Sequence, residues 1–270
     1  MKISIVIPNY NGEAFLDSCL QAVFKQQYKD FEVIVVDNGS KDRSLEILKS
    51  YTNQVTTIAL RENYGFSKAC NEGINQASGD FVVLLNNDTE VKPYWLENLV
   101  ECISKDGEIF SCSSKMLRYD DKNLIDDAGD EYTIMGWSKK RGDGKPIIKY
   151  AHDSEVFSAC AGAALYRRDI FDEIGYFDEN FGSYVEDMDL SFRAKLHGYK
   201  IYYSANSIVN HYGSAATGSR YNAFKVEISA RNNIYMIYKN MNIFMLVLNF
   251  IFICLGIIIK YLFFHHKGFE

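Results

Sequence analysis

The sequence lacks the short glycine-containing motifs that identify several common enzyme classes. No GxGxxG follows an apolar run, and neither GxxxxGK[ST] nor GxSxG is present. The first two motifs are loops that hold phosphates in dinucleotide-binding and P-loop enzymes, and the third is the nucleophile turn of α/β-hydrolases. Their absence argues against these three classes. It also implies that any phosphate in a substrate would have to be held by a metal ion.

The chain also has little positive charge and no paired cysteine motif. Its 270 residues include 29 Lys and Arg against 35 Asp and Glu, a net charge of -6, whereas nucleic-acid binders usually carry a strongly basic face. The cysteines form no CxxC pair, show no metal-ligand spacing and often lie in apolar runs, which is typical of a reducing compartment. They are Cys19, Cys70, Cys102, Cys112, Cys160 and Cys254. The acidic charge balance predicts that the protein has no nucleic-acid partner.

What is present is the composition of a globular protein, 47% apolar and 24% charged, with room for one large domain or two small ones. The first apolar run is too short for a signal peptide and predicts a core strand. Apolar runs then alternate with amphipathic stretches through the first hundred residues. The predicted strands are 3–7, 31–37, 55–60 and 81–85, and the predicted helices lie around 15–23, 44–51, 66–77 and 93–103. This alternation predicts an α/β fold, with a mostly parallel sheet covered by helices on both faces.

Polar residues follow each of these four predicted strands. The four turns are 8–12, 37–40, 61–65 and 86–88, and each contains Asn. A single Asn- or Asp-rich turn is common where a strand ends. In parallel sheets, however, ligands bind beyond the carboxyl ends of the strands, and all four turns would lie at that edge. The sequence therefore predicts a polar crevice there.

The second half of the chain is less regular. Residues 113–157 lose clear periodicity, and we interpret them as an irregular excursion within the same domain. A strand is then predicted at 160–168, followed by a short helix and turn at 169–178. Residues 185–200 predict a helix with an acidic start and Gly198 at its C-terminal cap, and 200–205 predict a further strand.

Three clusters could carry chemistry, and each has a structural alternative. Asp88, a substrate diphosphate and the imidazole of His211 would make a reasonable site for Mg²⁺ or Mn²⁺. Asp88 could equally belong to a plain turn, and His211 could be bonded to backbone. Glu186, Asp187 and Asp189 would complement a helix dipole, but mutual repulsion and burial could instead raise the pKa of one of them toward that of a general base. The residues alone leave this open.

Taken in order, the motifs resemble a known family. They are IVIPNYNG, VIVVDNGSKD, RENYGFSKACNEGI, GDFVVLLNNDTEV, CAGAALYRR, GYFDENFGSYVEDMDLSFRAKLHGYKIYY and NHYGS. From about residue 3 to 235 the chain resembles the inverting family 2 glycosyltransferases of the GT-A fold. It is most similar to the rhamnosyltransferase-like branch that builds bacterial surface polysaccharides.

The resemblance implies a set of residues for the nucleotide and the donor sugar. They are Pro8, Asn9, Tyr10, Asp37, Asn63, Gly65, Lys68, Asn71, Asn87 and Gly162. Lys68 would also face phosphate, and the backbone of residues 160–163 would form a wall beside the transferred sugar.

The resemblance further implies the metal ligands and the catalytic acids. Asp88 and His211 would bind Mg²⁺ or Mn²⁺. Because NND lacks the first acid of a full DxD, we expect modest metal affinity. Asp187 would be the catalytic base, with Glu186 beside it to orient a sugar. The implied reaction moves a sugar from a nucleoside-diphosphate sugar to a hydroxyl of a glycan or lipid-linked glycan acceptor, with inversion.

Two other functions are compatible with parts of the same pattern. A sugar-phosphate nucleotidyltransferase shares the alternating start and the polar crevice. It would need a glycine-rich phosphate loop after the first strand, and PNYNGEAF does not offer one. A membrane-tethered sugar-binding protein without turnover is the non-enzymatic alternative. The joint presence of Asp88, Asp187 and His211 argues against it.

The C-terminal segment predicts contact with a membrane. Residues 243–264 would span roughly 33 Å as a helix, close to the thickness of the hydrocarbon core. Crossing the bilayer, lying on its surface and packing as a buried core helix are the three alternatives. From Arg220 onward the sequence contains six Lys and Arg but two Glu, and this positive charge favours binding to the anionic cytoplasmic face of the cell membrane. We therefore expect a catalytic domain over 1–238, with 113–157 on the acceptor side, and a membrane-associating tail over 239–270.

Overall fold

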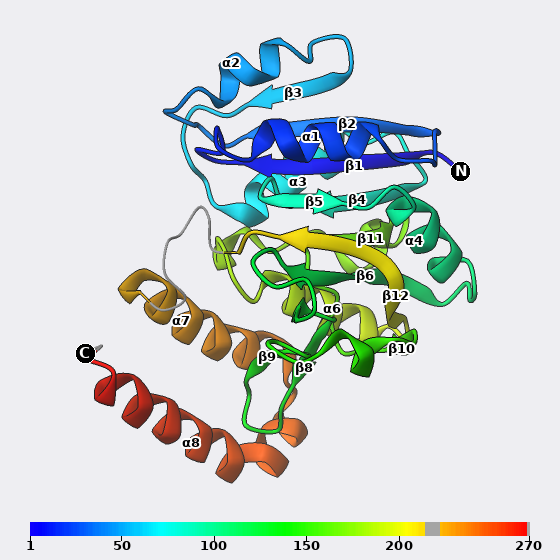
Figure 1. Cartoon of the computed structure of the whole chain (residues 1–270). Coiled ribbons are helices and arrows are strands. Elements are labelled where there is room, and N and C mark those ends of the chain that lie inside the picture. Colours follow the sequence, from blue (N-terminus) through cyan, green and yellow to red (C-terminus); the bar gives the residue numbers. More distant parts are fainter. Residues whose placement is uncertain (214–221, 269–270) are drawn as a thin grey trace.

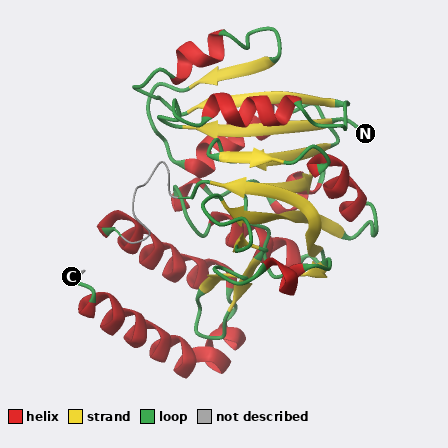
Figure 2. Ribbon diagram, viewed as in Figure 1, coloured by secondary structure: helices red, strands yellow, loops and turns green. Residues whose placement is uncertain are grey.

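The computed structural model describes residues 1–213 and 222–268. Ser214, the last residue of the NHYGS motif, and Arg220, counted above among the basic residues, lie outside the described residues. A central sheet has the strand order β10-β12-β6-β11-β4-β1-β2-β3, with β5 paired to β12 and β7 paired to β6 (Figure 1). Helices lie against both faces of this sheet (Figure 2).

The first part of the chain forms the parallel half of the sheet. Its strands are β1 (Ile3–Asn9), β2 (Phe31–Asp37), β3 (Val55–Ala59), β4 (Phe81–Leu85) and the short β5 (Thr89–Val91). Its helices are α1 (Leu16–Phe24), α2 (Ser44–Lys49), α3 (Phe66–Gln76) and α4 (Trp95–Ile103). β1 lies between β2 and β4 and is parallel to both. The strands and helices predicted for this region are confirmed.

Alternation of side chains along β1 explains why the sheet has two apolar faces. Ile3, Ile5 and Ile7 pack on one face with α1 and α4, while Val6 packs on the other with α3. Both sets of side chains are buried, and apart from the buried Ser4 the strand is apolar from Ile3 to Ile7, as is typical of a parallel sheet.

The second part of the chain completes the sheet and adds the helices of the C-terminal side. Its strands are β6 (Ile109–Arg118), β7 (Ile125–Asp127), β8 (Asp130–Tyr132), β9 (Ser138–Lys140), β10 (Ser154–Glu155), β11 (Ala163–Arg167) and β12 (Lys200–His211). Its helices are η1 (Ile147–Tyr150), α5 (Ile170–Ile174), η2 (Glu179–Phe181), α6 (Glu186–Leu196), α7 (Ala223–Asn240) and α8 (Ile243–His266). β11 is antiparallel to both of its neighbours, whereas β12 is parallel to β6.

Two boundaries predicted in this part are wrong. Residues 113–118 are not irregular but continue β6, and they were missed because Ser111, Ser113 and Ser114 are buried polar residues that break the apolar pattern. The last predicted strand does not end at residue 205 but reaches His211. A register shift between Ser204 and Ile208 lets it continue past an irregular point.

α8 is the one helix in the described part of the chain that is long and apolar enough to cross a membrane. Most of its side chains are exposed, and only Ile253 and Gly256 are buried. Gly256 lies against the tip of the β8–β9 hairpin, where an added Cβ would meet the carbonyl oxygen of Met135 at 2.7 Å. Nearby, Nζ of Lys260 lies 5.2 Å from the ring centre of Trp137. The hairpin is therefore one contact between α8 and the rest of the protein (Figure 1), and Ile253 of α8 also packs in a cluster with Phe181 and Met236.

Candidate active site

The polar turns after the first four strands open into one cavity. It has a volume of about 1420 Å³ and is lined by residues of every one of these turns. Asn9 is the last residue of β1, and Asn38, Asn63 and Asn87 come from the turns after β2, β3 and β4 respectively. This edge of the sheet is where parallel α/β folds bind ligands. The polar crevice expected from the sequence is therefore confirmed.

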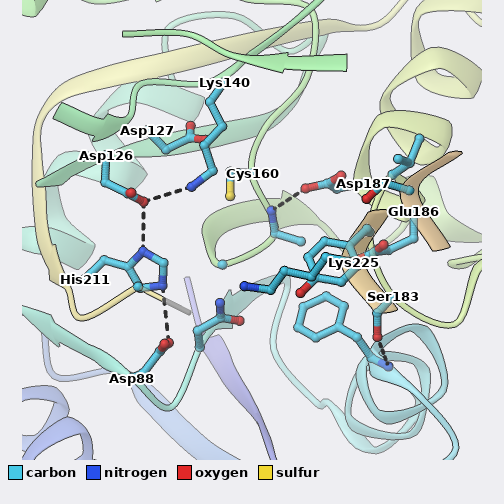
Figure 3. Close-up of a pocket in the computed structure, with 18 of the residues that line it drawn as sticks. Asp88, Asp126, Asp127, Lys140, Cys160, Ser183, Glu186, Asp187, His211 and Lys225 are labelled. Carbon is cyan, nitrogen blue, oxygen red and sulfur yellow. Dashed lines mark hydrogen bonds and ion pairs between the residues drawn. The ribbon is translucent and has the colours of Figure 1, made fainter. Parts of the chain in front are cut away.

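Asp88, directly before β5, meets His211 at the end of β12. β5 and β12 are antiparallel with Thr89 opposite His211, so the sheet itself brings the two side chains together. Oδ1 of Asp88 lies 3.3 Å from Nε2 of His211, and Nδ1 of His211 lies 2.8 Å from Oδ2 of Asp126 (Figure 3). The same oxygen of Asp126 lies 3.0 Å from Nζ of Lys140.

The two carboxylates control the protonation of His211. Burial lowers the pKa of the imidazole, but the hydrogen bonds and charges of Asp126 and Asp88 outweigh burial and raise the pKa to about 9. At neutral pH the imidazole therefore carries a proton toward Asp88 unless a metal cation takes its place. Asp126 was not predicted, because it belongs to a three-residue strand within the stretch that shows no periodicity.

A row of amides connects the turns on the nucleotide side. Nδ2 of Asn87 donates to Oδ1 of Asn9 at 2.7 Å, and Nδ2 of Asn9 donates to Oδ1 of Asp37 at 3.4 Å. Asn38, which was not predicted, donates from Nδ2 to Oδ1 of Asn63 at 3.0 Å. These bonds fix the turns relative to one another and orient the amides at the cavity edge.

Glu186 and Asp187 begin α6 on the opposite side of the cavity. Oδ2 of Asp187 accepts the N–H of Ala161 at 3.2 Å, and Oδ1 accepts the N–H of Met188 at 2.8 Å. Burial raises the pKa of Asp187, although these N–H groups act against it. Burial and the charge of Asp187 also raise the pKa of Glu186 well above its usual value. Burial, which favours the protonated acid, therefore outweighs the N–H groups at the start of α6, which favour the charged carboxylate.

The third acid of this group has a structural role. Asp189 is fully buried and forms ion pairs with Arg193 and Lys239, both at 3.0 Å. Nδ2 of Asn240 also donates to it at 2.8 Å. Because Lys239 and Asn240 belong to α7, Asp189 fastens that helix to α6.

The backbone just before Glu186 is strained. Tyr184 and Val185 have φ of 69° and 72°, in the left-handed region that a β-branched residue such as Val rarely enters. Asn232 of α7 holds this loop, because its Nδ2 lies within 2.7–2.9 Å of the carbonyl oxygens of Phe181, Ser183 and Tyr184. Strained residues of this kind cluster at functional sites, where the surrounding structure maintains them.

Comparison with known proteins assigns the chain to a family. Residues 4–175, more than half of the chain, match the sequence model of the family described as Glycosyl transferase family 2. The chain belongs to glycosyltransferase family 2. This glycosyltransferase is 30% identical over 199 residues to the Bacillus subtilis (strain 168) glycosyltransferase YwdF. The aligned region covers 72% of this chain and 68% of YwdF. It spans between 15% and 68% of the lengths of the first curated relatives that it matches.

Solved structures show that this family 2 glycosyltransferase has the GT-A fold. It is similar to GalNAc-T7 bound to UDP, GalNAc and Mn²⁺, with a TM-score of 0.71 and 19% identity over 88% of this chain and 48% of that one. It is also similar to S. aureus TarS 1-349 bound to UDP-GlcNAc, with a TM-score of 0.62 and 23% identity over 90% of this chain and 68% of TarS. The α/β fold with a mostly parallel sheet is confirmed.

Most residues predicted for the site of this glycosyltransferase line the cavity. They are Pro8, Asn9, Tyr10, Asn63, Gly65, Asn87, Asp88, Gly162, Glu186, Asp187 and His211. Their individual roles stay predictions. Cys160 and Ala161 lie beside Gly162 in the same lining, as expected for the wall formed by residues 160–163.

Three predicted residues of the glycosyltransferase do not line the cavity. Asp37 is buried below the turn after β2, where its Oδ2 accepts the N–H of Ser40 at 3.1 Å. Nδ2 of Asn71 donates to the carbonyl of Phe177 at 2.9 Å, so its amide holds a neighbouring loop. Lys68 forms ion pairs with Glu72 of α3 and Glu179 of η2. The roles expected for these three residues toward the nucleotide and the donor stay predictions, because the resemblance gives positions but not side-chain directions.

Asp88 and His211 fit a divalent cation. Ligands of Mg²⁺ lie at about 2.1 Å, so two neighbouring ligands of an octahedral ion are about 3 Å apart, close to the 3.3 Å between Oδ1 and Nε2. The other ring nitrogen of His211 faces Asp126, which is the carboxylate–histidine arrangement that orients metal-binding imidazoles. With one carboxylate and one imidazole from the protein, the remaining positions would be left to water and substrate oxygens.

Proposed function

We propose that this protein transfers a sugar from a nucleoside-diphosphate sugar to an acceptor hydroxyl with inversion at the anomeric carbon. The observation that carries the proposal is the convergence of two acidic groups in one cavity. Asp88 with His211 lies on one side and Asp187 lies on the other, although Asp88 and Asp187 are far apart in the sequence. A reaction that needs both a diphosphate site and a base can take place between them.

The donor would lie along the turns after the first four strands. The backbone and side chains of Pro8, Asn9 and Tyr10, together with Asn63 and Gly65, would hold the nucleotide, and Asn87 would face the diphosphate. Support comes from the fold, because GalNAc-T7 and TarS have been solved with UDP or UDP-GlcNAc. The rhamnosyl preference implied by the sequence resemblance stays a prediction.

Asp88 and His211 would hold Mg²⁺ or Mn²⁺. When bound, such an ion offsets negative charge on a nucleoside diphosphate leaving group. Asp126 keeps Nε2 of His211 directed at Asp88, and Lys140 supports Asp126 from the other side. The resulting site has one carboxylate from the protein, which is consistent with the modest affinity expected for an Asn-x-Asp motif.

Asp187 would accept the proton of the acceptor hydroxyl. The N–H groups of Ala161 and Met188 fix both carboxylate oxygens, so the group is positioned before the substrate binds. As the acceptor oxygen attacks the anomeric carbon from the side opposite to the diphosphate, its proton moves to Asp187, and this single displacement inverts the configuration. Glu186, whose pKa is raised by burial and by the charge of Asp187, would lie beside the base and orient a sugar.

The acceptor would be a glycan or a lipid-linked glycan, met at the cytoplasmic face of the cell membrane. α8 has 24 residues, which corresponds to roughly 36 Å of helix, and most of its apolar side chains are exposed. Phe264 of α8 and Phe224 of α7 line the cavity, so its mouth is next to the proposed membrane helix. A catalytic domain over 1–238 and a membrane-associating tail over 239–270 are part of this proposal.

A nucleotide-release assay tests the function. Purified protein with Mn²⁺ is given a panel of UDP- and GDP-sugars, and release of the free nucleotide is measured with and without candidate acceptors. We expect one donor to be turned over, and Asp187→Asn to nearly abolish transfer while nucleotide binding by calorimetry is kept. Near wild-type turnover of Asp187→Asn would show that another group is the base.

A further inference from the structure

A second set of reactive groups lies in the cavity, and neither the metal site nor the base uses it. Asp127 ends β7, Asp130 begins β8, and Cys160 precedes β11. One carboxylate oxygen of each Asp and Sγ of Cys160 lie within 4.8 Å of one another, and all three residues line the cavity. Figure 3 shows Asp127 and Cys160 in this lining. The next residue, Ala161, donates its N–H to Asp187, so this set is adjacent to the proposed base.

One oxygen in this set lacks an N–H or hydroxyl donor in the described part of the chain. Asp127 is fully buried, and its Oδ1 accepts the N–H of Gly129 at 2.7 Å, which shapes the turn between β7 and β8. Its Oδ2 accepts no hydrogen bond from an N–H or hydroxyl group of the described residues, and the neighbouring carboxyl of Asp130 can donate to it only when Asp130 is protonated. A buried oxygen without a donor is destabilising, and a ligand that donates a hydrogen bond to it would remove that cost. Because this oxygen belongs to a cavity-lining residue, it indicates a place for such a ligand.

The charge around Asp127 defines the ligand. Burial raises the pKa of Asp127 to about 7, and burial together with the charges of Asp127 and Asp187 raises the pKa of Asp130 well above its usual value. The pair therefore holds a proton near neutral pH, so it offers both a donor and an acceptor, which are what a hydroxyl group can satisfy. Lys140 is paired with Asp126, so these two charges offset each other, and the charge of Asp187 remains to repel a diphosphate or a uronic acid.

We propose that Asp127 and Asp130 form the acceptor subsite and bind hydroxyl groups of a neutral or amino sugar beside Asp187. The inference rests on the proposed function, and it assigns the acceptor side of the same cavity. The donor and the metal would occupy the side of Asp88, so the two substrates would lie on opposite sides of the reacting atoms. The hairpin strands β8 and β9 would then form the wall that selects the acceptor.

Binding can be measured without knowing the natural acceptor. Full-length protein is saturated with UDP and Mn²⁺, and saturation-transfer NMR is recorded with three probes: methyl glucoside, methyl glucosaminide and methyl glucuronide. We expect the neutral and amino glycosides to bind and the anionic glucuronide to bind at least about tenfold more weakly. Calorimetry of UDP with Mn²⁺ is measured separately, so failure of the donor site is distinguished from failure of the acceptor subsite.

Asp127→Asn is the decisive variant. The new side chain keeps an oxygen for the N–H of Gly129 and replaces only the second oxygen by an amide nitrogen, so the turn is preserved. We expect at least a tenfold weaker binding of methyl glucoside with unchanged UDP affinity. Glu131→Gln is the matched control, because it removes one acid from the same strand as Asp130 at a residue that does not line the cavity. Asp130→Asn is the second variant if Asp127→Asn folds poorly.

Three results would overturn the proposal. The first is wild-type affinity for methyl glucoside in both Asp127→Asn and Asp130→Asn. The second is the absence of saturation transfer from the wild-type protein to all three glycosides, or a preference for the glucuronide. The third is tight binding of Zn²⁺ that is lost in both Asp127→Asn and Cys160→Ser, because the same groups would then form a metal site.

Discussion

The strained loop before Glu186 depends on a single side chain of α7, which gives a sharp test of how the catalytic acids are positioned. In Asn232→Ala, three carbonyl oxygens of residues 181–184 lose their shared donor. Loss of buried hydrogen bonds costs about 1–3 kcal/mol of stability. Tyr184 and Val185 also have left-handed backbone conformations, each of which costs about 1–3 kcal/mol and persists only while it is restrained.

Without that restraint the loop can relax, and Asp187 would spend less time in its bonded position. If relaxation is favoured by about 1.4–2.8 kcal/mol, the share of correctly positioned enzyme falls ten- to a hundredfold. We therefore expect kcat to fall by that factor. UDP affinity should fall less, because the loop contacts the nucleotide side through bonds of Ser183 and Gly182 to the N–H groups of residues 66 and 67, not through the amides at the cavity edge. The assay is nucleotide release, at a temperature well below the melting temperature of the variant and with UDP affinity measured by calorimetry.

Asn98→Ala provides a matched control. Asn98 also joins a helix to a distant segment, with Nδ2 donating to the carbonyls of Tyr94 and Asn206 at 2.7 and 2.9 Å, but it does not line the cavity. It should lose stability and keep its turnover. If Asn232→Ala is destabilised but retains kcat within about twofold of wild type, the loop does not need this restraint and the reasoning is refuted.

Three further predictions follow from other contacts. Asp126→Asn should weaken Mn²⁺ affinity about 10–100-fold in calorimetry with UDP, because His211 loses the carboxylate that orients it. Asp178→Asn should lower the free energy of unfolding at pH 7 but hardly at pH 2. Although burial alone would raise it, hydrogen bonds from Lys239, Asn180 and Tyr235 lower the pKa of Asp178 to about 2, so the stabilisation is present above the usual 3.8 and is lost as the pH falls through 2. Deletion of residues 241–270 should release the protein from anionic vesicles in a sedimentation assay.

One result would contradict each of these three predictions. Unchanged Mn²⁺ affinity of Asp126→Asn would mean that His211 is oriented without it. A stability loss in Asp178→Asn that is the same at pH 2 and pH 7 would exclude a charge effect. Equal sedimentation of the truncated and full-length proteins with vesicles would place membrane contact elsewhere in the chain.

The sequence predicts the parallel half of the fold well, because its strands are apolar on both faces and its helices are amphipathic. β6 was missed at its C-terminal end for a physical reason: buried Ser111, Ser113 and Ser114 give no apolar signal. A sheet can bury such small hydroxyl groups, but no periodicity rule detects them.

The sequence identifies cavity residues that lie within recognisable motifs, but it does not identify residues whose role depends on contact with a distant segment. Asp88, Asp187 and His211 were found through motifs that resemble the family. Asp126 and Asn232 were not, because one belongs to a short strand without pattern and the other to a helix face whose partner loop lies about fifty residues earlier in the chain. Pairing of that kind depends on the folded arrangement.

The close approach of Gly256 to the β8–β9 hairpin has a mechanical consequence. Because a Cβ at position 256 would lie 2.7 Å from the carbonyl oxygen of Met135, a side chain larger than that of glycine would push α8 away from the hairpin. At the other end the same hairpin carries Asp130 and Lys140. The hairpin therefore connects α8 to the cavity, and a displacement of α8 could be transmitted to the cavity through β8 and β9, which form a sheet of their own beside the central sheet.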